Sequence, residues 1–557
     1  RNADSLYQNI YLMQRGADRP LRLSADTTID WSPTWSPDGR FVAYVQGGNG
    51  AHQVTIIPSI GGQGRPVIRL ADRRIHSISW SPDTSQTTLA MSAQQRPHQA
   101  FGLSILLPDA DSVRSLTGPP LWSTGDTRPA FSPDGSKIAF VRGSVDGVGN
   151  LFVVPTEGGD PMQVTTDSTT IHGLTWTQDG EDLIYSAKRG GVSGLWRVDA
   201  DGGTPSLLRT ASEGTVFSHP TVSAHRLAYS QQSAQLDIWK LGRSRRYEAF
   251  RAEEVVSSTQ EDTHPSLSPS GDRLAFISER SGHPEVWVSE MNGTASTQVT
   301  AMEGPDLRSV VWSSEGNQIC FLARVNGKTN LFTVSASGGP SVQITDTSAE
   351  ALVPRWARND RWIYYASNRT GRWEIWRTSL TTSRTQQVTR GGAVAAQESG
   401  SGEALYVVRA DTQGVWAAPL DTTKFPLLTR PLPGKDSLQA LPDRFLSEDS
   451  SQAGAPSQDE TAQSEPAFQQ VLSHVDPQDR QNWWVEEAGI YFLEHRRFRT
   501  AVLTYFDFRS GRTVPIYTFP DWQPNQQIAV GPGGSVFAYT HVARWESDVM
   551  LIENVEQ

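Results

Sequence analysis

Trp35-Ser-Pro-Asp-Gly39 decides the fold of this chain, because variants of the same phrase return along most of its length. A second clear copy is Phe131-Ser-Pro-Asp-Gly135, and a short hydrophobic run follows it. The weaker copies are Trp80-Ser-Pro-Asp83, Trp176-Thr-Gln-Asp-Gly180, a degenerate copy opening at Val222, Leu267-Ser-Pro-Ser-Gly271, Trp312-Ser-Ser-Glu-Gly316 and Trp356-Ala-Arg-Asn-Asp360. Their spacing is about 45 residues, the length of one four-stranded β-propeller blade. The repeat therefore predicts an all-β protein built from such blades.

One repeat, from Phe131 to Thr165, shows how a blade is expected to form. Pro133-Asp-Gly135 provides turn chemistry, because proline presets its own φ and Asp-Gly tolerates the positive φ of tight hairpins. Ile138-Ala-Phe-Val141 is a short apolar run, typical of a strand buried on both faces. Leu151-Phe-Val-Val154 and Met162-Gln-Val-Thr165 predict the third and fourth strands. One blade cannot cover its two apolar faces, so blades must stack in a ring.

The number of repeats exceeds what one ring usually holds. Counting along the chain gives about eleven or twelve blades, whereas single propellers have roughly four to eight. We therefore expect tandem β-propellers, with a split of six plus six preferred. The predicted domains are residues 1–258 and 259–557, with the seam near 242–262, where a charged stretch interrupts the pattern.

Residues 431–480 break the blade pattern. They include the polar, acidic segment Pro456-Ser-Gln-Asp-Glu-Thr-Ala-Gln-Ser-Glu-Pro466, which is poor in aromatic residues. This composition is typical of disordered segments, because such residues cannot bury enough apolar surface to offset the entropy of folding. The stretch is predicted to be an acidic, disordered insertion within the second propeller: a solvated loop between blades or a partner-binding segment.

Composition excludes several classes of function. The chain has 557 residues and a formal net charge of −11, and it shows no basic stripe, which argues against nucleic-acid binding by this chain. No apolar run reaches the length of a membrane span. Cys320 is the sole cysteine and is expected to be a buried apolar residue of an inner strand.

The blades resemble the TolB-like, PD-type propeller repeats of bacterial envelope proteins. They are similar above all to the extracytoplasmic propeller region of bacterial membrane regulators with a winged-helix DNA-binding domain or a Ser/Thr kinase. The residues carrying this resemblance are Gly194-Leu-Trp-Arg197, Asp237-Ile-Trp-Lys240, Ala366-Ser-Asn-Arg-Thr-Gly371 with Glu374-Ile-Trp376, and Ser547-Asp-Val-Met-Leu-Ile-Glu-Asn554.

The resemblance implies a sensing or docking module for a protein, peptide or envelope ligand. It implies a periplasmic or cell-envelope location, with membrane attachment through a segment preceding residue 1. Any output activity would lie outside this chain, and the long acidic insertion departs from the pattern. Propellers host many unrelated activities, so the motif is specific for fold and weakly specific for function.

The sequence lacks the common signatures of catalysis. It contains no Gly-x-Ser-x-Gly nucleophile elbow, P-loop, His-Glu-x-x-His or paired Cys-x-x-Cys. We therefore expect a non-enzymatic protein with no catalytic residues, no cofactor and no metal. Two alternatives stay open: a structural or scaffold subunit of a larger envelope complex, and a propeller hydrolase or lyase with its active site in the channel.

One constellation of basic residues suggests a binding site. Residues just before or within inner strands are expected at one mouth of the ring, and the basic residues there are His76, Arg128, His172, His219, His264, Arg308 and Arg355. They predict a channel-mouth site for an anionic group, a peptide terminus or a metal, responsive to pH because histidine titrates near neutrality. A metal is disfavoured, because ligands from different blades are too far apart to share one ion. The alternative is that the imidazoles bond loop carbonyls and stabilise the stack of blades.

Overall fold

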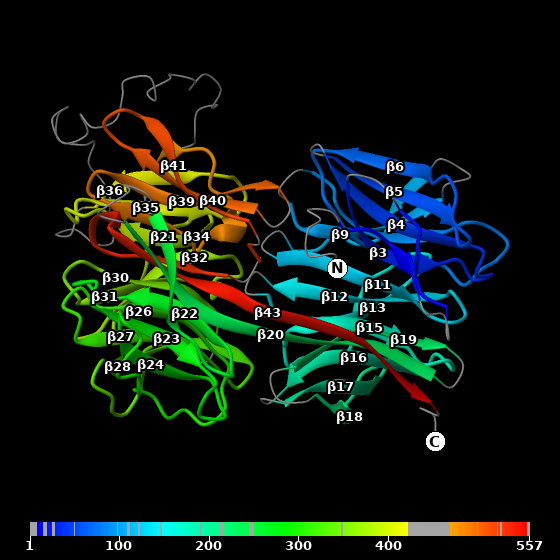
Figure 1. The fold of residues 1–557 in the computed structure, drawn as a ribbon, viewed down its shortest axis with the longest axis horizontal. Helices are drawn as coiled ribbons and strands as arrows, with labels where there is room; N and C mark the ends of the chain where they lie inside the picture. Colours follow the sequence, from blue (N-terminus) through cyan, green and yellow to red (C-terminus); the bar gives the residue numbers. More distant parts are fainter. Residues whose placement is uncertain are drawn as a thin grey trace, which may run out of the picture. The chain divides into compact units, whose positions relative to one another are not determined.

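The repeated unit is a four-stranded antiparallel sheet in the computed structural model of the chain (Figure 1). In the repeat around Phe131, β11 (Ser123–Phe131) pairs with β12 (Lys137–Ser144), which pairs with β13 (Gly149–Pro155), and β14 (Met162–Gln163) is the outer strand. The all-β propeller prediction is confirmed, and the described residues contain no α-helix.

The structure describes most of the chain. The described ranges are 8–14, 19–24, 28–48, 51–96, 99–107, 112–120, 123–144, 147–189, 192–211, 215–223, 226–243, 250–346, 349–420, 468–497, 500–520, 522–523 and 526–553.

Contacts within the chain define two compact units, residues 1–233 with 545–557, and residues 234–544. The sheets of the first unit are built from β1 (Tyr11–Leu12), β2 (Leu21–Arg22), β3 (Ile29–Trp35), β4 (Phe41–Gly48), β5 (Ala51–Pro58), β6 (Arg65–Ala71), β7 (Ile75–Trp80), β8 (Leu89–Gln94), β9 (Phe101–Leu107), β10 (Ser112–Ser115), β11 to β14, β15 (Ile171–Trp176), β16 (Asp182–Arg189), β17 (Val192–Asp199), β18 (Ser206–Thr210), β19 (Thr215–Ser223) and the start of β20 (Arg226–Arg243).

The second unit follows the same plan. Its elements are the end of β20, β21 (Phe250–Val256), β22 (Asp262–Leu267), β23 (Arg273–Ser278), β24 (Glu285–Glu290), β25 (Thr297–Gln298), β26 (Leu307–Trp312), β27 (Gln318–Val325), β28 (Lys328–Ser335), β29 (Val342–Gln343), β30 (Ala351–Trp356), β31 (Trp362–Ser367), β32 (Glu374–Ser379), β33 (Thr385–Gln387), β34 (Ala393–Glu398), β35 (Ala404–Arg409), β36 (Val415–Pro419), β37 (Gln469–Leu472), η3 (Pro477–Asp479), β38 (Trp483–Glu486), β39 (Gly489–Arg497), β40 (Thr500–Asp507), β41 (Arg512–Phe519), β42 (Ile528–Val530), η4 (Pro532–Gly534) and the start of β43 (Val536–Glu553).

The units differ from the domains predicted at 1–258 and 259–557. The reason is that β20 and β43 are 18-residue strands, and each contributes residues to both units. Residues 226–233 of β20 pair with β19 in the first unit, whereas residues 238–243 pair with β21 in the second. The interruption of the repeat pattern after residue 242 therefore falls inside a blade of the second unit.

The predicted insertion at 431–480 is partly outside the described residues, which resume at 468. Residues 469–472 form β37, the outer strand of the sheet that begins at β34, and 477–479 form η3. The end of the stretch predicted to be disordered is therefore ordered: β37 supplies the fourth strand that this blade needs.

The Ser-Pro-Asp-Gly phrase folds as the turn between the first and second strands. The Ser36 hydroxyl donates to Asp38 Oδ1 (2.6 Å) and accepts the main-chain N–H of Phe41 (2.9 Å). Asp38 Oδ1 also accepts the N–H of Arg40 (3.0 Å), and these bonds lower the pKa of Asp38. Gly39 has φ +70°, a conformation that side chains disfavour. Corresponding bonds recur in the turns 132–137, 177–182 and 268–273.

The tryptophan before the turn joins neighbouring blades. In the described sheets, no hydrogen-bond ladder links the first strands of adjacent blades, so these strands need another connection. The indole N–H donates to a main-chain oxygen of the preceding inner strand in three pairs: Trp176 to Ala130 (3.0 Å), Trp312 to Ser266 (3.0 Å) and Trp356 to Val311 (3.1 Å). The repeated tryptophan is thus explained by a bond that spans one repeat.

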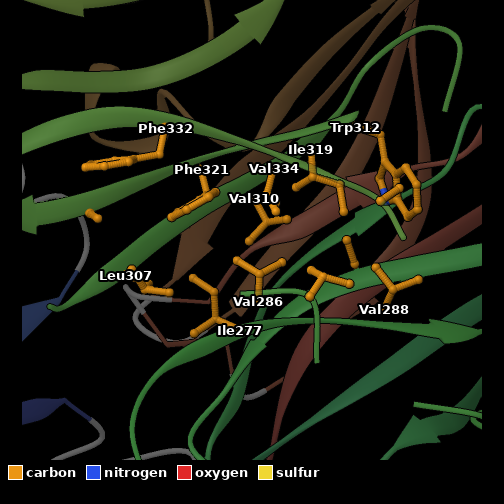
Figure 2. Close-up of a cluster of buried hydrophobic side chains, with 14 residues drawn as sticks. Ile277, Val286, Val288, Leu307, Val310, Trp312, Ile319, Phe321, Phe332 and Val334 are labelled. Carbon is orange, nitrogen blue, oxygen red and sulfur yellow. The ribbon is translucent and has the colours of Figure 1, made fainter. Parts of the chain in front are cut away.

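Apolar side chains fill the space between adjacent blades. Figure 2 shows Ile277, Val286 and Val288 of one sheet facing Val310 and Phe321 of the next, all buried. Burying a side chain of this size stabilises the fold by about 1.5–3 kcal/mol. The hydrophobic runs of the repeat therefore hold the blades in register against each other.

The threonine that follows the outer strand fixes it to the third strand. Thr165 Oγ1 accepts the main-chain N–H of Leu151 (2.9 Å), and both residues are buried. The same bond joins Thr117 to Leu103, Thr300 to Val286, Thr345 to Leu331 and Thr389 to Ile375, at 2.8 to 3.0 Å.

We expect Thr165→Val to lower the free energy of unfolding by about 1–3 kcal/mol, because the Leu151 N–H would lose its bond to the hydroxyl in a buried place. Urea unfolding followed by tryptophan fluorescence measures this change. Thr165→Ser keeps the hydroxyl and is the matched control. Equal losses in the two variants would show that the methyl group matters and the hydrogen bond does not.

Candidate functional site

Three of the predicted site residues occupy equivalent positions on their inner strands. Arg128, His219 and His264 have φ of 55°, 50° and 55°, and each precedes a proline. The strand ladder shifts register at each of them, so they are bulge residues. A left-handed non-glycine residue costs about 1–3 kcal/mol, and the surrounding sheets hold it in place.

The other four do not share that position, which corrects the expectation of one recurrent position. His76 and His172 are single bulge residues, skipped by the ladder between Ile75 and Ser77 and between Ile171 and Gly173. Arg308 precedes the left-handed Ser309, and Arg355 lies two residues after the left-handed Val353. The kind of bulge, which the repeat alignment does not show, decides where each side chain points.

The first unit brings four of the predicted residues together: His76 on β7, Arg128 on β11, His172 on β15 and His219 on β19. Burial lowers the pKa of His76 to about 3 and the pKa values of His172 and His219 to about 4, and the positive charge of Arg128 lowers all three further. The charge of His219, when it is protonated, also lowers the pKa values of His76 and His172. The strands that carry these residues pack in sequence, β7 against β11, β11 against β15 and β15 against β19. We call the four side chains the basic cluster.

Short polar contacts position the basic cluster. His76 Nδ1 lies 3.0 Å from the Ser77 hydroxyl, and this hydroxyl accepts the main-chain N–H of Arg128 at 3.0 Å. A Cβ atom at Gly173 would lie 2.6 Å from the main-chain nitrogen of His219, so only glycine permits this approach of β19 to β15. His76, Arg128 and His172 are half-buried and His219 is exposed, so all four residues keep some contact with solvent.

The remaining three predicted residues belong to the second unit. Arg308 forms an ion pair with Asp306 (2.7 Å), and burial followed by the charge of Arg308 lowers the pKa of His264 to about 4. Arg355 donates to the main-chain oxygens of Pro354 (3.1 Å) and Gln481 (3.3 Å), and burial lowers its pKa to about 10. Four of the seven predicted residues therefore belong to the first unit and three to the second.

The inner strands of the second unit surround a cavity of about 370 Å³. All six strands β22, β26, β30, β34, β38 and β42 contribute residues to its wall. The polar and aromatic side chains of its wall include Arg355, Gln397, Trp484, Glu486 and Gln527. Only Arg355 was predicted from the sequence.

Side-chain bonds close the ring around this cavity. Gln397 donates to the Val485 carbonyl and accepts its N–H, both at 3.2 Å, and so joins β34 to β38. Asn482 accepts the N–H of Ile528 (3.2 Å) and joins β38 to β42. The cavity is thus enclosed by a continuous ring of blades.

The described residues hold no group of three or more histidine, cysteine, aspartate or glutamate side chains placed to bind a metal ion. Cys320 is buried, as expected, and burial raises its pKa. No helix in the described ranges has both the length and the apolar character needed to cross a membrane.

Comparison with known proteins shows the family to which the chain belongs. The family model of the TolB beta propeller domain matches residues 122–305 and 226–437, which together make up more than half of the sequence. The chain belongs to the TolB β-propeller family. The resemblance of the repeats to TolB-like propeller repeats is confirmed.

Two curated relatives and one solved structure show how similar the chain is to known proteins. The chain is 26% identical over 205 residues to an uncharacterized protein of Agrobacterium fabrum, covering 34% of this chain and 68% of that protein. It is 25% identical over 285 residues to the putative tricorn protease homolog 2 of Streptomyces coelicolor, covering 41% of this chain and 23% of the relative. The tricorn protease structure matches at 13% identity with a TM-score of 0.30, over 90% of this chain and 55% of that chain. The chain thus spans less than a quarter of the Streptomyces relative, and the likeness to the solved structure concerns the fold alone.

The basic cluster makes stability depend on pH. The folded-state pKa values of its histidines lie below the ordinary value of 6.5, so the neutral imidazoles contribute stability above pH 6.5 that is lost as the pH falls toward 4. We expect His172→Gln to reduce the loss of unfolding free energy between pH 7.5 and pH 5 by about 1 kcal/mol.

Urea unfolding at both pH values measures this loss. His283→Gln, which changes an exposed residue on a turn of the second unit, is the control and should lose as much stability as the unmodified protein. If His172→Gln behaves like the control, His172 is not held neutral by its surroundings.

Proposed function

We propose that this TolB-family chain is a non-enzymatic binding module that docks an extended protein or peptide segment in the cavity of the second unit. It would lie on the extracytoplasmic side of the cell envelope, as the sensor portion of a membrane-anchored regulator. The observation that carries the proposal is the cavity itself, whose wall offers donors, acceptors, an aromatic ring and a cation from six strands.

The cavity wall suits an extended peptide. A peptide backbone presents N–H donors and carbonyl acceptors, and the amides of Gln397 and Gln527 offer both. Trp484 supplies an apolar surface for a side chain, and it is only half-buried. Arg355 has main-chain oxygens as its hydrogen-bond acceptors and no described carboxylate acts on it, so a carboxylate of the ligand would find its charge uncompensated.

The proposed location and regulatory role follow from the family and from the repeat phrases. The matching family model supports a TolB-type protein, and the repeat phrases resemble those of extracytoplasmic regulators. The sequence upstream of residue 1 tests this part: a membrane helix preceded by a DNA-binding or kinase domain is expected.

The docking proposal predicts that Arg355→Gln weakens partner binding about 10-fold or more, because a charge-assisted bond to a carboxylate is lost. A partner is first isolated from envelope fractions, and its affinity for the purified chain is then measured by calorimetry. Arg361→Gln, at an exposed position of the same blade, is the matched control and should bind normally. Equal affinities of the two variants, with both folded by circular dichroism, would exclude the cavity as the docking site.

One observation favours an enzyme as a second candidate. Burial raises the pKa of Glu486 in the cavity wall, while Arg358 opposes the shift. A carboxyl group with a raised pKa can act as a general acid in a hydrolase or lyase. By contrast, Glu398 is held by the Arg358 N–H (2.7 Å) and the Tyr364 hydroxyl (2.9 Å).

An enzyme of this kind would turn over small esters, glycosides or peptides, and Glu486→Gln would reduce kcat at least 100-fold while the fold is kept. Assays with chromogenic substrates of these three classes test this candidate. Turnover that Glu486→Gln leaves unchanged would come from a contaminant or from another site.

A further inference from the structure

We propose that the inner strands of the first unit bind an oxyanion through Arg128 on β11, with His76, His172 and His219 on β7, β15 and β19. This inference is independent of the proposed function, because it concerns the other unit and a different kind of ligand. The inference begins with the positive charge of Arg128.

Arg128 differs from several arginines on or beside the inner strands, and it shares the lack of a described carboxylate partner with Arg355 of the second unit. Other arginines have carboxylate partners: Arg142 with Asp126 (2.7 Å), Arg280 with Asp262 (2.8 Å) and Arg308 with Asp306 (2.7 Å). The Arg128 guanidinium has no hydrogen bond or ion pair with any described residue, and burial lowers its pKa. A cation that is shielded from water and has no counter-charge lowers the free energy of unfolding, so a bound anion would stabilise the fold.

The carboxylates nearest in sequence are engaged elsewhere. Asp126 is fully buried and takes both of its bonds from Arg142, at 2.7 and 2.9 Å. Asp30, on the inner strand β3 beside β7, is buried and accepts a bond from the Thr28 hydroxyl (3.2 Å). No described carboxylate acts on the imidazoles of the basic cluster. The groups that face Arg128 are therefore basic from β7, β15 and β19 alike.

The same arrangement disfavours a metal ion. Arg128 repels protons from all three imidazoles, and it would repel a cation in the same way. A neutral imidazole still offers one N–H donor, and each of the three rings keeps solvent-accessible surface. A guanidinium with up to three N–H donors around it matches the acceptor oxygens of sulfate, phosphate or a carboxylate.

Anion binding at this place should be coupled to proton uptake. At pH 7.5 the imidazoles are neutral and Arg128 alone carries the charge. A bound anion would raise the imidazole pKa values, so the complex takes up protons as the pH falls, and affinity should increase on the order of 10-fold between pH 7.5 and 5.5. Sulfate is the suitable probe, since its own charge does not change in this range.

The experiment measures the unfolding temperature of the full chain in sulfate against chloride at equal ionic strength. The unmodified protein should be stabilised by sulfate, and more strongly at pH 5.5 than at pH 7.5. Arg128→Gln should abolish the sulfate effect, and in chloride it should unfold at the same or a higher temperature than the unmodified protein. Arg308→Gln, which removes an arginine already paired with a carboxylate, should keep the full sulfate effect.

A second variant covers the case in which Arg128→Gln does not fold. His219 is exposed, so His219→Gln should fold, and it should weaken sulfate binding several-fold at pH 5.5 and little at pH 7.5. Parallel titrations with phosphate and acetate tell whether a tetrahedral or a carboxylate anion binds better. The proposal fails if sulfate stabilises Arg128→Gln as much as the unmodified protein, if sulfate has no effect beyond chloride, or if zinc ions stabilise the protein and sulfate does not.

Discussion

The inner strands of neighbouring blades have to be joined without a backbone ladder, and the rest of the structure depends on how this is done. Most blades pair their main-chain groups within four strands, although β11 also pairs with β9 of the preceding blade at Gly125 and Phe101. The contact between inner strands is therefore made by side chains. Tryptophan indoles and glutamine, asparagine and serine side chains span the gap to the next inner strand, as in Trp312 to Ser266, Gln397 to Val485 and Ser77 to Arg128. Each such bond contributes only about 1 kcal/mol, but it sets the register of the apolar faces that provide most of the stability.

This constraint explains why so few channel residues are free for function. Gln397 and Asn482 face the interior of the second unit, yet their amides hold blades together. Arg308 is neutralised by Asp306 beside it. Once these structural roles are accounted for, Arg128 in one unit and Arg355 in the other remain as cations on which no described carboxylate acts. Both lie on inner strands, where a ligand entering a channel would meet them.

The fold could be predicted from the sequence because its determinants are local. The turn needs a hydroxyl, a carboxylate and a glycine in fixed order, as in Ser36, Asp38 and Gly39, and the period of the repeat gives the blade. The path of β20 could not be predicted, because an 18-residue strand that serves two units leaves no linker in the sequence.

The site was less accessible to prediction for a different reason. Trp484 and Glu486 lie on β38, which is joined to β39 by a two-residue turn, so this blade has no Ser-Pro-Asp-Gly phrase to mark the end of its inner strand. The basic cluster was found because histidines recur near inner strands. The division of the seven predicted residues between two units depends on contacts between residues far apart in the sequence.

Backbone strain alone does not mark the functional positions of this protein. Ser32 and Val353 have the same left-handed conformation before proline as Arg128 and His219, although they carry no charge. The strain therefore belongs to the architecture: it bends several inner strands at the same place, and the rest of the blade offsets its cost. What distinguishes the first unit is the side chain placed on that bend. A serine there can bond the next strand, as Ser32 does with the N–H of Ile78 at 3.0 Å. The side chain of Arg128 makes no such bond to the next strand. A bound anion would compensate for the missing contact by pairing with the guanidinium.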